Sequence, residues 1–102
     1  MGSFRLTPKA KADLTEIRDY TRRTHGKAQC ARYLLDLQTA FRQLAENPSL
    51  GRQCDNISPG LQRMEHAHHV VFFRSKPYGV RIVRVLHERM LPARHNMDDP
   101  EE

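Results

Sequence analysis

The sequence predicts an α+β fold in which one strand and two helices precede three further strands, in the order β-α-α-β-β-β. Apolar side chains recur every three or four residues through the first half of the chain, as they do in amphipathic helices. β-branched and aromatic residues then concentrate between residues 61 and 87, as they do in strands. The connections are short, so consecutive elements should pack antiparallel. We therefore expect an antiparallel sheet packed by an N-terminal helical hairpin.

The first strand and first helix are marked by local sequence signals. Residues 3–7 alternate apolar and polar side chains, which predicts a short edge strand. Thr7 is suited to cap the free amides of a following helix, and Pro8 fits its first position because the missing N–H costs nothing there. Gly26 predicts the end of this helix near residues 24–25. Its apolar stripe consists of Ala10, Leu14, Ile17 and Thr21.

A second helix follows after about two residues and ends at Asn47-Pro48. Its apolar face has steps of three and four residues and consists of Cys30, Leu34, Leu37, Phe41 and Leu44. Two amphipathic helices joined this closely must form an antiparallel hairpin. We expect Leu14, Ile17, Leu34 and Phe41 to lie in the core.

The second half of the chain predicts a loop and three strands. Residues 48–60 are rich in Pro, Gly and Asn or Ser, which indicates a loop. Strands are predicted at 61–67, 68–75 and 80–87, with a turn at 76–79 that contains Pro77 and Gly79. Residues 1–97 are expected to form a single domain, followed by an acidic, disordered tail at 98–102.

The chain is basic, with 17 Lys and Arg against 12 Asp and Glu and a formal net charge of +5. Such a surface favours acidic partners, either nucleic acid or an acidic protein segment. No segment approaches the roughly 20 apolar residues of a membrane-spanning helix, and the first residues do not resemble a secretion signal. We therefore expect a cytoplasmic protein that does not bind membranes, with Cys30 and Cys54 as free thiols.

Positive charge concentrates in the predicted strands and just after them. Arg81 and Arg84 must point to opposite faces of their strand, so one of them needs a partner on the helix side. The other face of the sheet is predicted to be a basic groove for an acidic ligand; the alternative is a solvated face without a ligand. The residues predicted to contact the target are Arg63, Arg74, Arg84, His87 and Arg89.

A metal site is not predicted. His66 and His68 share a face of their strand, but no cysteine or carboxylate at suitable spacing completes a ligand set. Ordinary strand and turn histidines are the expected interpretation, and no cofactor is expected.

Several strings of the sequence, taken in order, resemble the ParE/RelE toxin superfamily. The segment LTPKAKADLTEIRDYT is similar to the opening strand and first helix of that family. NPSLGR and PGLQRMEHAHHVVFFR resemble its loop and central strands, and VRIVRVLHERMLPARH resembles its last strand and tail. The resemblance runs from about Phe4 to His95, nearly the whole chain, and is closer to ParE than to RelE.

The resemblance implies a toxin of a type II toxin–antitoxin system. Such a toxin would be neutralised by a cognate ParD-like antitoxin, whose acidic, flexible C-terminal segment wraps the toxin. The complex would bind its operator DNA through the antitoxin. Tyr20, Tyr33 and Leu35 lie off the main apolar stripes, and we expect them to be exposed anchors for the antitoxin.

Two activities are implied by the superfamily. ParE-like members inhibit DNA gyrase and block replication without chemistry of their own, and we take this as the first prediction. RelE-like members are ribosome-dependent mRNA endoribonucleases; here His87 would be the acid or base, with Arg63, Arg84 and Arg89 around the phosphate. The lysine cluster or C-terminal tyrosine common in those nucleases is missing. Glu88 stands where ParE-like members usually have glycine.

Overall fold

The computed structural model describes residues 2–90 and 92–97. Strand β1 (Ser3–Leu6) is followed by two long helices, α1 (Pro8–His25) and α2 (Lys27–Glu46). After the short 3-10 helix η1 (Pro48–Leu50) come the strands β2 (Arg52–Gln53), β3 (Gln62–His66), β4 (His69–Lys76) and β5 (Gly79–His87), and then the 3-10 helix η2 (Pro92–Arg94). The predicted α+β fold is confirmed. The predicted acidic tail, 98–102, lies outside the described residues.

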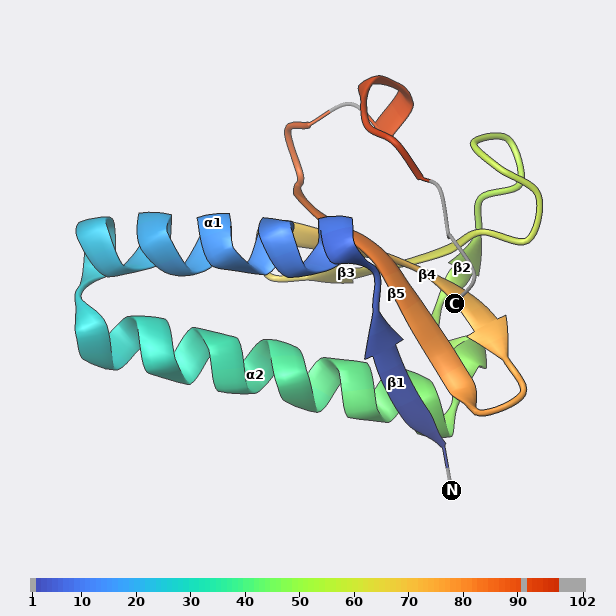
Figure 1. Ribbon diagram of the computed structural model, residues 1–102, viewed down its shortest axis with the longest axis horizontal. Coiled ribbons are helices and arrows are strands. Elements are labelled where there is room, and N and C mark those ends of the chain that lie inside the picture. Colours follow the sequence, from blue (N-terminus) through green and yellow to red (C-terminus); the bar gives the residue numbers. More distant parts are fainter. Residues whose placement is uncertain (1, 91, 98–102) are drawn as a thin grey trace.

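The helical hairpin is as predicted. Figure 1 shows α1 and α2 side by side and antiparallel, with the turn between them pointing away from the strands. Gly26 forms that turn with a φ of 86°, a conformation that glycine adopts without strain. At the start of α1, the Thr7 hydroxyl accepts a hydrogen bond from the Ala10 N–H at 3.0 Å and donates one to the Val83 carbonyl at 2.7 Å. The capping residue therefore also fixes α1 against β5.

The sheet is mixed rather than wholly antiparallel. Among the described residues, five strands lie in the order β1-β5-β4-β3-β2. β4 pairs antiparallel with both β3 and β5, which confirms the predicted three-stranded unit. β1 instead pairs parallel with β5, with Phe4 opposite Val80. The antiparallel prediction is wrong at this edge. Two helices separate β1 from the other strands in the sequence. A connection of that length allows β1 to pair with β5 in either direction.

The predicted loop at 48–60 contains two short elements. η1 begins at Pro48, and β2 extends the sheet by pairing with β3, where Arg52 lies opposite Arg63. A strand of two residues is too short to show an alternating pattern, so the sequence did not indicate it.

The main core lies between the helices and the sheet. Ile17 of α1, Phe41 of α2 and Phe73 of β4 are buried there. The prediction that Leu14 and Leu34 belong to the core holds in part, because both are partly buried and packed against this cluster. Burial of this apolar face is what holds the hairpin on the sheet.

The opposite face of the sheet holds a second apolar cluster rather than an open basic groove. Phe72 of β4 and Val83 of β5 are buried on this face, with Cys54 and Leu61 from the 54–61 loop and Met97 from the C-terminal segment. The predicted groove is therefore wrong for the middle of this face. The sequence pattern placed the strands correctly but did not show that a loop and a C-terminal segment would cover them.

Cys30 and Cys54 are both buried free thiols, as expected. Within residues 2–90 and 92–97, no helix has the length and hydropathy required to cross a membrane.

Candidate functional site

The five residues predicted to contact the target lie in two separate places. Arg84, His87 and Arg89 line a cleft of about 700 Å³ between α1 and the end of β5, called here the β5 cleft. Arg63 lies on β3 and Arg74 on β4, closer to the β2 edge of the sheet. The structure therefore brings three of the five together and not the other two.

Arg84 is held by an ion pair inside the molecule. Its Nε and Nη2 atoms donate to the two carboxylate oxygens of Asp13, both at 2.8 Å, and only 12% and 9% of the two side chains are exposed. The hydrogen bonds to Asp13 raise the pKa of the Arg84 guanidinium. Asp13 also accepts the Val85 N–H at 2.9 Å, next to a register shift between β4 and β5. The expected helix-side partner is thus Asp13, and the arginine has a structural role.

Arg63 and Arg74 are also engaged in contacts within the protein. Arg63 Nε lies 3.0 Å from the Glu65 carboxylate. Arg74 donates from Nη1 to the Pro59 carbonyl at 2.6 Å and from Nη2 to the Ser58 hydroxyl at 2.7 Å. Arg74 therefore fastens the loop that covers the second apolar cluster.

The β5 cleft contains the remaining two predicted residues. Arg89 is exposed, and its backbone N–H donates to His87 Nδ1 at 3.2 Å. A neutral His87 must then carry its proton on Nε2. Tyr20, which is 59% exposed, lines the same cleft. Of the phosphate-binding arginines that a nuclease would need beside His87, Arg63 is elsewhere and Arg84 is already paired.

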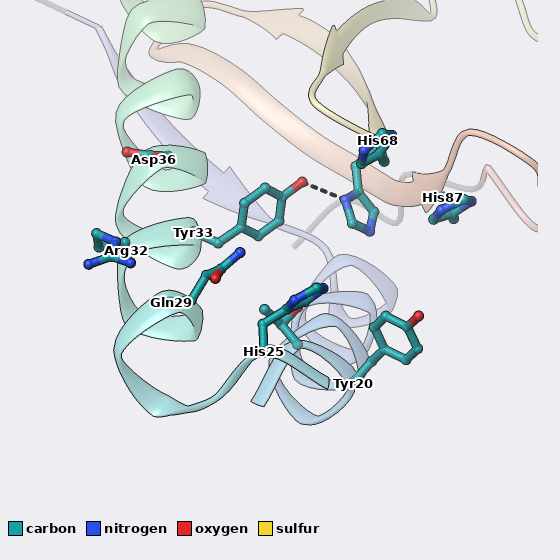
Figure 2. Close-up of a pocket in the computed structure, with 10 residues that line it drawn as sticks. Tyr20, His25, Gln29, Arg32, Tyr33, Asp36, His68 and His87 are labelled. Carbon is teal, nitrogen blue, oxygen red and sulfur yellow. Dashed lines mark hydrogen bonds between the residues drawn. The ribbon is translucent and has the colours of Figure 1, made fainter. Parts of the chain in front are cut away.

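A second pocket of about 600 Å³ adjoins the cleft and is called here the histidine pocket. Tyr33 points from α2 toward the histidines and makes a hydrogen bond of 2.5 Å with His69 Nδ1 (Figure 2). Burial, together with the negative charge of Asp36, raises the pKa of Tyr33 to about 12, so this phenol stays protonated. The pocket is lined by Tyr20, His25, Tyr33, His68, His69 and His87, among others.

His69 is the most perturbed histidine of this pocket. Burial, and then the charges of neighbouring histidines with His87 foremost, lower its pKa to about 4. His69 is therefore neutral at pH 7, with one ring nitrogen bound to Tyr33.

The stability of the protein should depend on the protonation of His69. The pKa of this side chain falls from 6.5 to about 4 on folding, so the unfolded chain binds the proton more readily between those pH values. The stabilisation is fully present above pH 6.5 and is lost as the pH falls toward 4. Urea unfolding at these two pH values should show a smaller acid loss for His69→Gln than for the wild type. An equal loss of unfolding free energy in the variant and the wild type would show that protonation of His69 is not the cause.

The third concave surface is an apolar groove between α1 and α2. It has a volume of about 490 Å³ and runs beside β1. Leu35, 61% exposed, projects at this groove, as expected of an exposed anchor. Its lining includes Phe4, Leu6, Leu14, Leu34, Leu35 and Phe41.

Tyr33 is not the exposed anchor that the sequence predicted. It is partly buried, and its hydroxyl is engaged with His69. Tyr20 is exposed as predicted, but it lies at the histidine pocket and the β5 cleft rather than at the groove. The three predicted antitoxin contacts therefore do not form one surface.

The histidines do not form a metal centre in the described part of the chain, where no three His, Cys, Asp or Glu side chains have an arrangement that could hold a metal ion. The two residues that sequence reasoning missed are Asp13 and His69. Asp13 had a detectable signal, because an acid stands within the apolar stripe of α1, next to Leu14 and one turn from Ile17. His69 had none, because its environment depends on the tertiary packing of α2 against the end of the sheet.

Comparison with known proteins agrees with this architecture. Residues 4–92 match the family described as ParE toxin of type II toxin–antitoxin system, parDE. The chain is 42% identical over 88 residues to toxin ParE1 of Mycobacterium tuberculosis H37Rv, covering 85% of this chain and 90% of the relative. It is 39% identical over 97 residues to toxin ParE1 of Caulobacter vibrioides, covering 93% and 98%.

The fold also matches a solved structure, described as the chromosomal ParDE toxin–antitoxin system from P. aeruginosa. The TM-score is 0.71 at 25% sequence identity, and the match covers 85% of this chain and 96% of that one. Sequence and fold thus agree, and the chain belongs to the ParE toxin family of type II toxin–antitoxin systems.

Proposed function

We propose that this toxin inhibits DNA gyrase in the cytoplasm, blocks replication, and is neutralised by a ParD-like antitoxin. It acts by binding rather than by chemistry of its own. The observation that carries the proposal is the match to ParE toxins over 85% of the chain or more. The engagement of Arg84 with Asp13 adds support, since it leaves His87 without the arginine cluster that an mRNA endoribonuclease would use.

We propose that the target contacts lie in the β5 cleft. Arg89 is the exposed residue of the predicted set; His87 is partly buried beside it, and Tyr20 lines the same cleft. An exposed cation next to an aromatic side chain favours contact with an acidic surface, whether of a protein or of its bound DNA. Arg63, Arg74 and Arg84 are better explained by their contacts within the toxin.

Reversing the charge of Arg89 should weaken toxicity without unfolding the protein. Arg89→Glu removes an exposed cation from the β5 cleft, so about tenfold more toxin should be needed to arrest growth at equal expression. The matched control is Arg42→Glu, the same charge change at an exposed position of α2. Equal loss of toxicity in both variants, or none in either, would contradict the proposal that the β5 cleft contacts the target.

We propose that the apolar groove receives the antitoxin. An exposed apolar groove between two helices suits the apolar face of an amphipathic segment that folds on binding. The antitoxin would also carry the toxin to operator DNA. Because Tyr20 and His87 line both the histidine pocket and the β5 cleft, an antitoxin that continues into the pocket would obstruct the contacts proposed for the target.

Incorporation of labelled precursors in cells separates the two activities of the superfamily. After induction of the toxin, a gyrase inhibitor should stop thymidine incorporation before methionine incorporation, and co-expressed antitoxin should restore both. An mRNA endoribonuclease would stop methionine incorporation first. If methionine incorporation stops first, the target is the ribosome and not gyrase.

A further inference from the structure

Four histidines gather at one end of the sheet. His66 ends β3, His69 begins β4 directly opposite it, and His87 ends β5 opposite His69. The fourth, His68, lies in the tight β3–β4 turn, where Ala67 has a φ of 53°. Strand register therefore brings residues 66–69 together with His87, which lies 18 to 21 positions later in the sequence.

The imidazole rings are close enough to affect one another. The ring centroids of His69 and His87 are 5.6 Å apart, and those of His68 and His87 are 6.5 Å apart. The Tyr33 ring lies 5.5 Å from His69 and 5.8 Å from His66. These short distances agree with the lowered pKa of His69, to which burial contributes most and the charges of the neighbouring histidines contribute next.

Charged and titratable groups of both signs face this cluster. The helices contribute His25 from α1 and Arg32 from α2, with Asp36 as the acid on their side of the pocket. On the strand side, Glu88 approaches His68 at 3.4 Å, and this pair is exposed. The adjoining β5 cleft adds the acids Glu16 and Asp19, the bases Arg23, Arg89 and His95, and the Asp13–Arg84 ion pair. These permanent charges nearly cancel, so the charge that an anion meets in the pocket depends on protonation of the imidazole rings.

Burial and the neighbouring rings disfavour a proton on His69, as its lowered pKa indicates. A bound carboxylate would offset both burial and the repulsion between rings, because an opposite charge within about 4–6 Å favours the charged form. Binding of an anion and uptake of a proton are therefore linked, and each promotes the other.

We propose that the histidine pocket binds a carboxylate of the antitoxin, and that this contact takes up a proton, so that the antitoxin binds more tightly as the pH falls. The inference rests on the proposed function, since it names the chemistry of one antitoxin contact. Tyr20, 59% exposed at the rim, can pack on the approaching segment.

A carboxylate fits this pocket better than the phosphates of a nucleic acid. Phosphate-binding surfaces rely on permanently charged Lys and Arg side chains, whereas the pocket presents Arg32 near Asp36 and several histidines. A site whose charge depends on protonation suits a ligand with a single negative charge from a flexible acidic segment.

Isothermal titration calorimetry of the full-length toxin with its full-length cognate antitoxin tests the proposal. Titrations in phosphate and in Tris, which differ in ionisation enthalpy, report the protons exchanged on binding. We expect net proton uptake, and an affinity that rises about threefold to tenfold from about pH 8 to about pH 6. Proton-neutral binding, or proton release, would overturn the proposal while leaving the antitoxin as a partner.

A double variant and a control variant test whether the proton is taken up in the histidine pocket. His68→Gln combined with His87→Gln removes two imidazole rings from the pocket and leaves the Tyr33–His69 hydrogen bond in place, so it should at least halve both the proton uptake and the pH dependence. His95→Gln, at the adjoining cleft, should preserve both. Equal proton uptake in the double variant and the wild type would refute the assignment.

Two further results separate a failure of the proposed function from a failure of this inference alone. If the folded toxin does not bind the antitoxin at any pH, the proposed function fails, and this inference fails with it. If a short single-stranded oligonucleotide binds with proton uptake that the double variant loses, while antitoxin binding is proton-neutral, the pocket belongs to a nucleic acid.

Discussion

Asp13→Ala is expected to lower the free energy of unfolding by about 3–5 kcal/mol, because it leaves a largely buried arginine without its counter-charge. Three hydrogen bonds are lost together, two from Arg84 and one from the Val85 N–H. Urea unfolding followed by circular dichroism measures the change.

The control for this prediction lies on the same helix. Asp19→Ala breaks an ion pair with Arg18 in which the two side chains are 53% and 50% exposed, and it should cost no more than about 1 kcal/mol. Replacing Arg84 by methionine in the Asp13→Ala background should recover part of the loss, because the buried charge is then gone. Similar losses for Asp13→Ala and Asp19→Ala would show that the ion pair does not hold α1 to β5.

Leu35→Glu is expected to weaken antitoxin binding by about 30-fold to 100-fold, since a buried leucine contributes about 1.5–3 kcal/mol and the variant also buries a charge. Leu35 is 61% exposed in the toxin alone, so the fold should not change. Titration calorimetry gives the affinity, and the urea midpoint checks folding.

A matched control is available on the same chain. Leu50, in η1, is 51% exposed and lies outside the apolar groove. Leu50→Glu makes the same chemical change there, so its affinity for the antitoxin should stay within about twofold of the wild type. If both variants bind as the wild type does, the antitoxin docks elsewhere.

The parts of the fold that could be predicted from the sequence depend on local interactions. Thr7, Pro8 and Gly26 define the ends of α1 through contacts within a few residues, and the structure has those ends where the sequence placed them. The β4–β5 hairpin is equally local, because its turn is short. Neighbouring residues decide both features, so the pattern alone is sufficient.

The features that could not be predicted depend on contacts distant in sequence. Tertiary packing determines the parallel pairing of β1 with β5 and the covering of the second sheet face by Met97. The same holds for the candidate site. The sequence alone does not distinguish an arginine that faces solvent from one that is paired within the fold. Arg84 is paired with a carboxylate 71 residues away in the chain. Tyr33 looked exposed because the strand end that covers it cannot be read from helical periodicity.

The most direct test of the account is a supercoiling assay with purified gyrase, relaxed plasmid and ATP, titrated with the folded toxin. We expect that supercoiling is lost and cleaved DNA accumulates, and that cognate antitoxin reverses both effects. Arg89→Glu should shift the inhibition curve to higher toxin concentration. Full gyrase activity in the presence of folded toxin, together with cleavage of ribosome-bound mRNA that His87→Ala abolishes, would contradict the account.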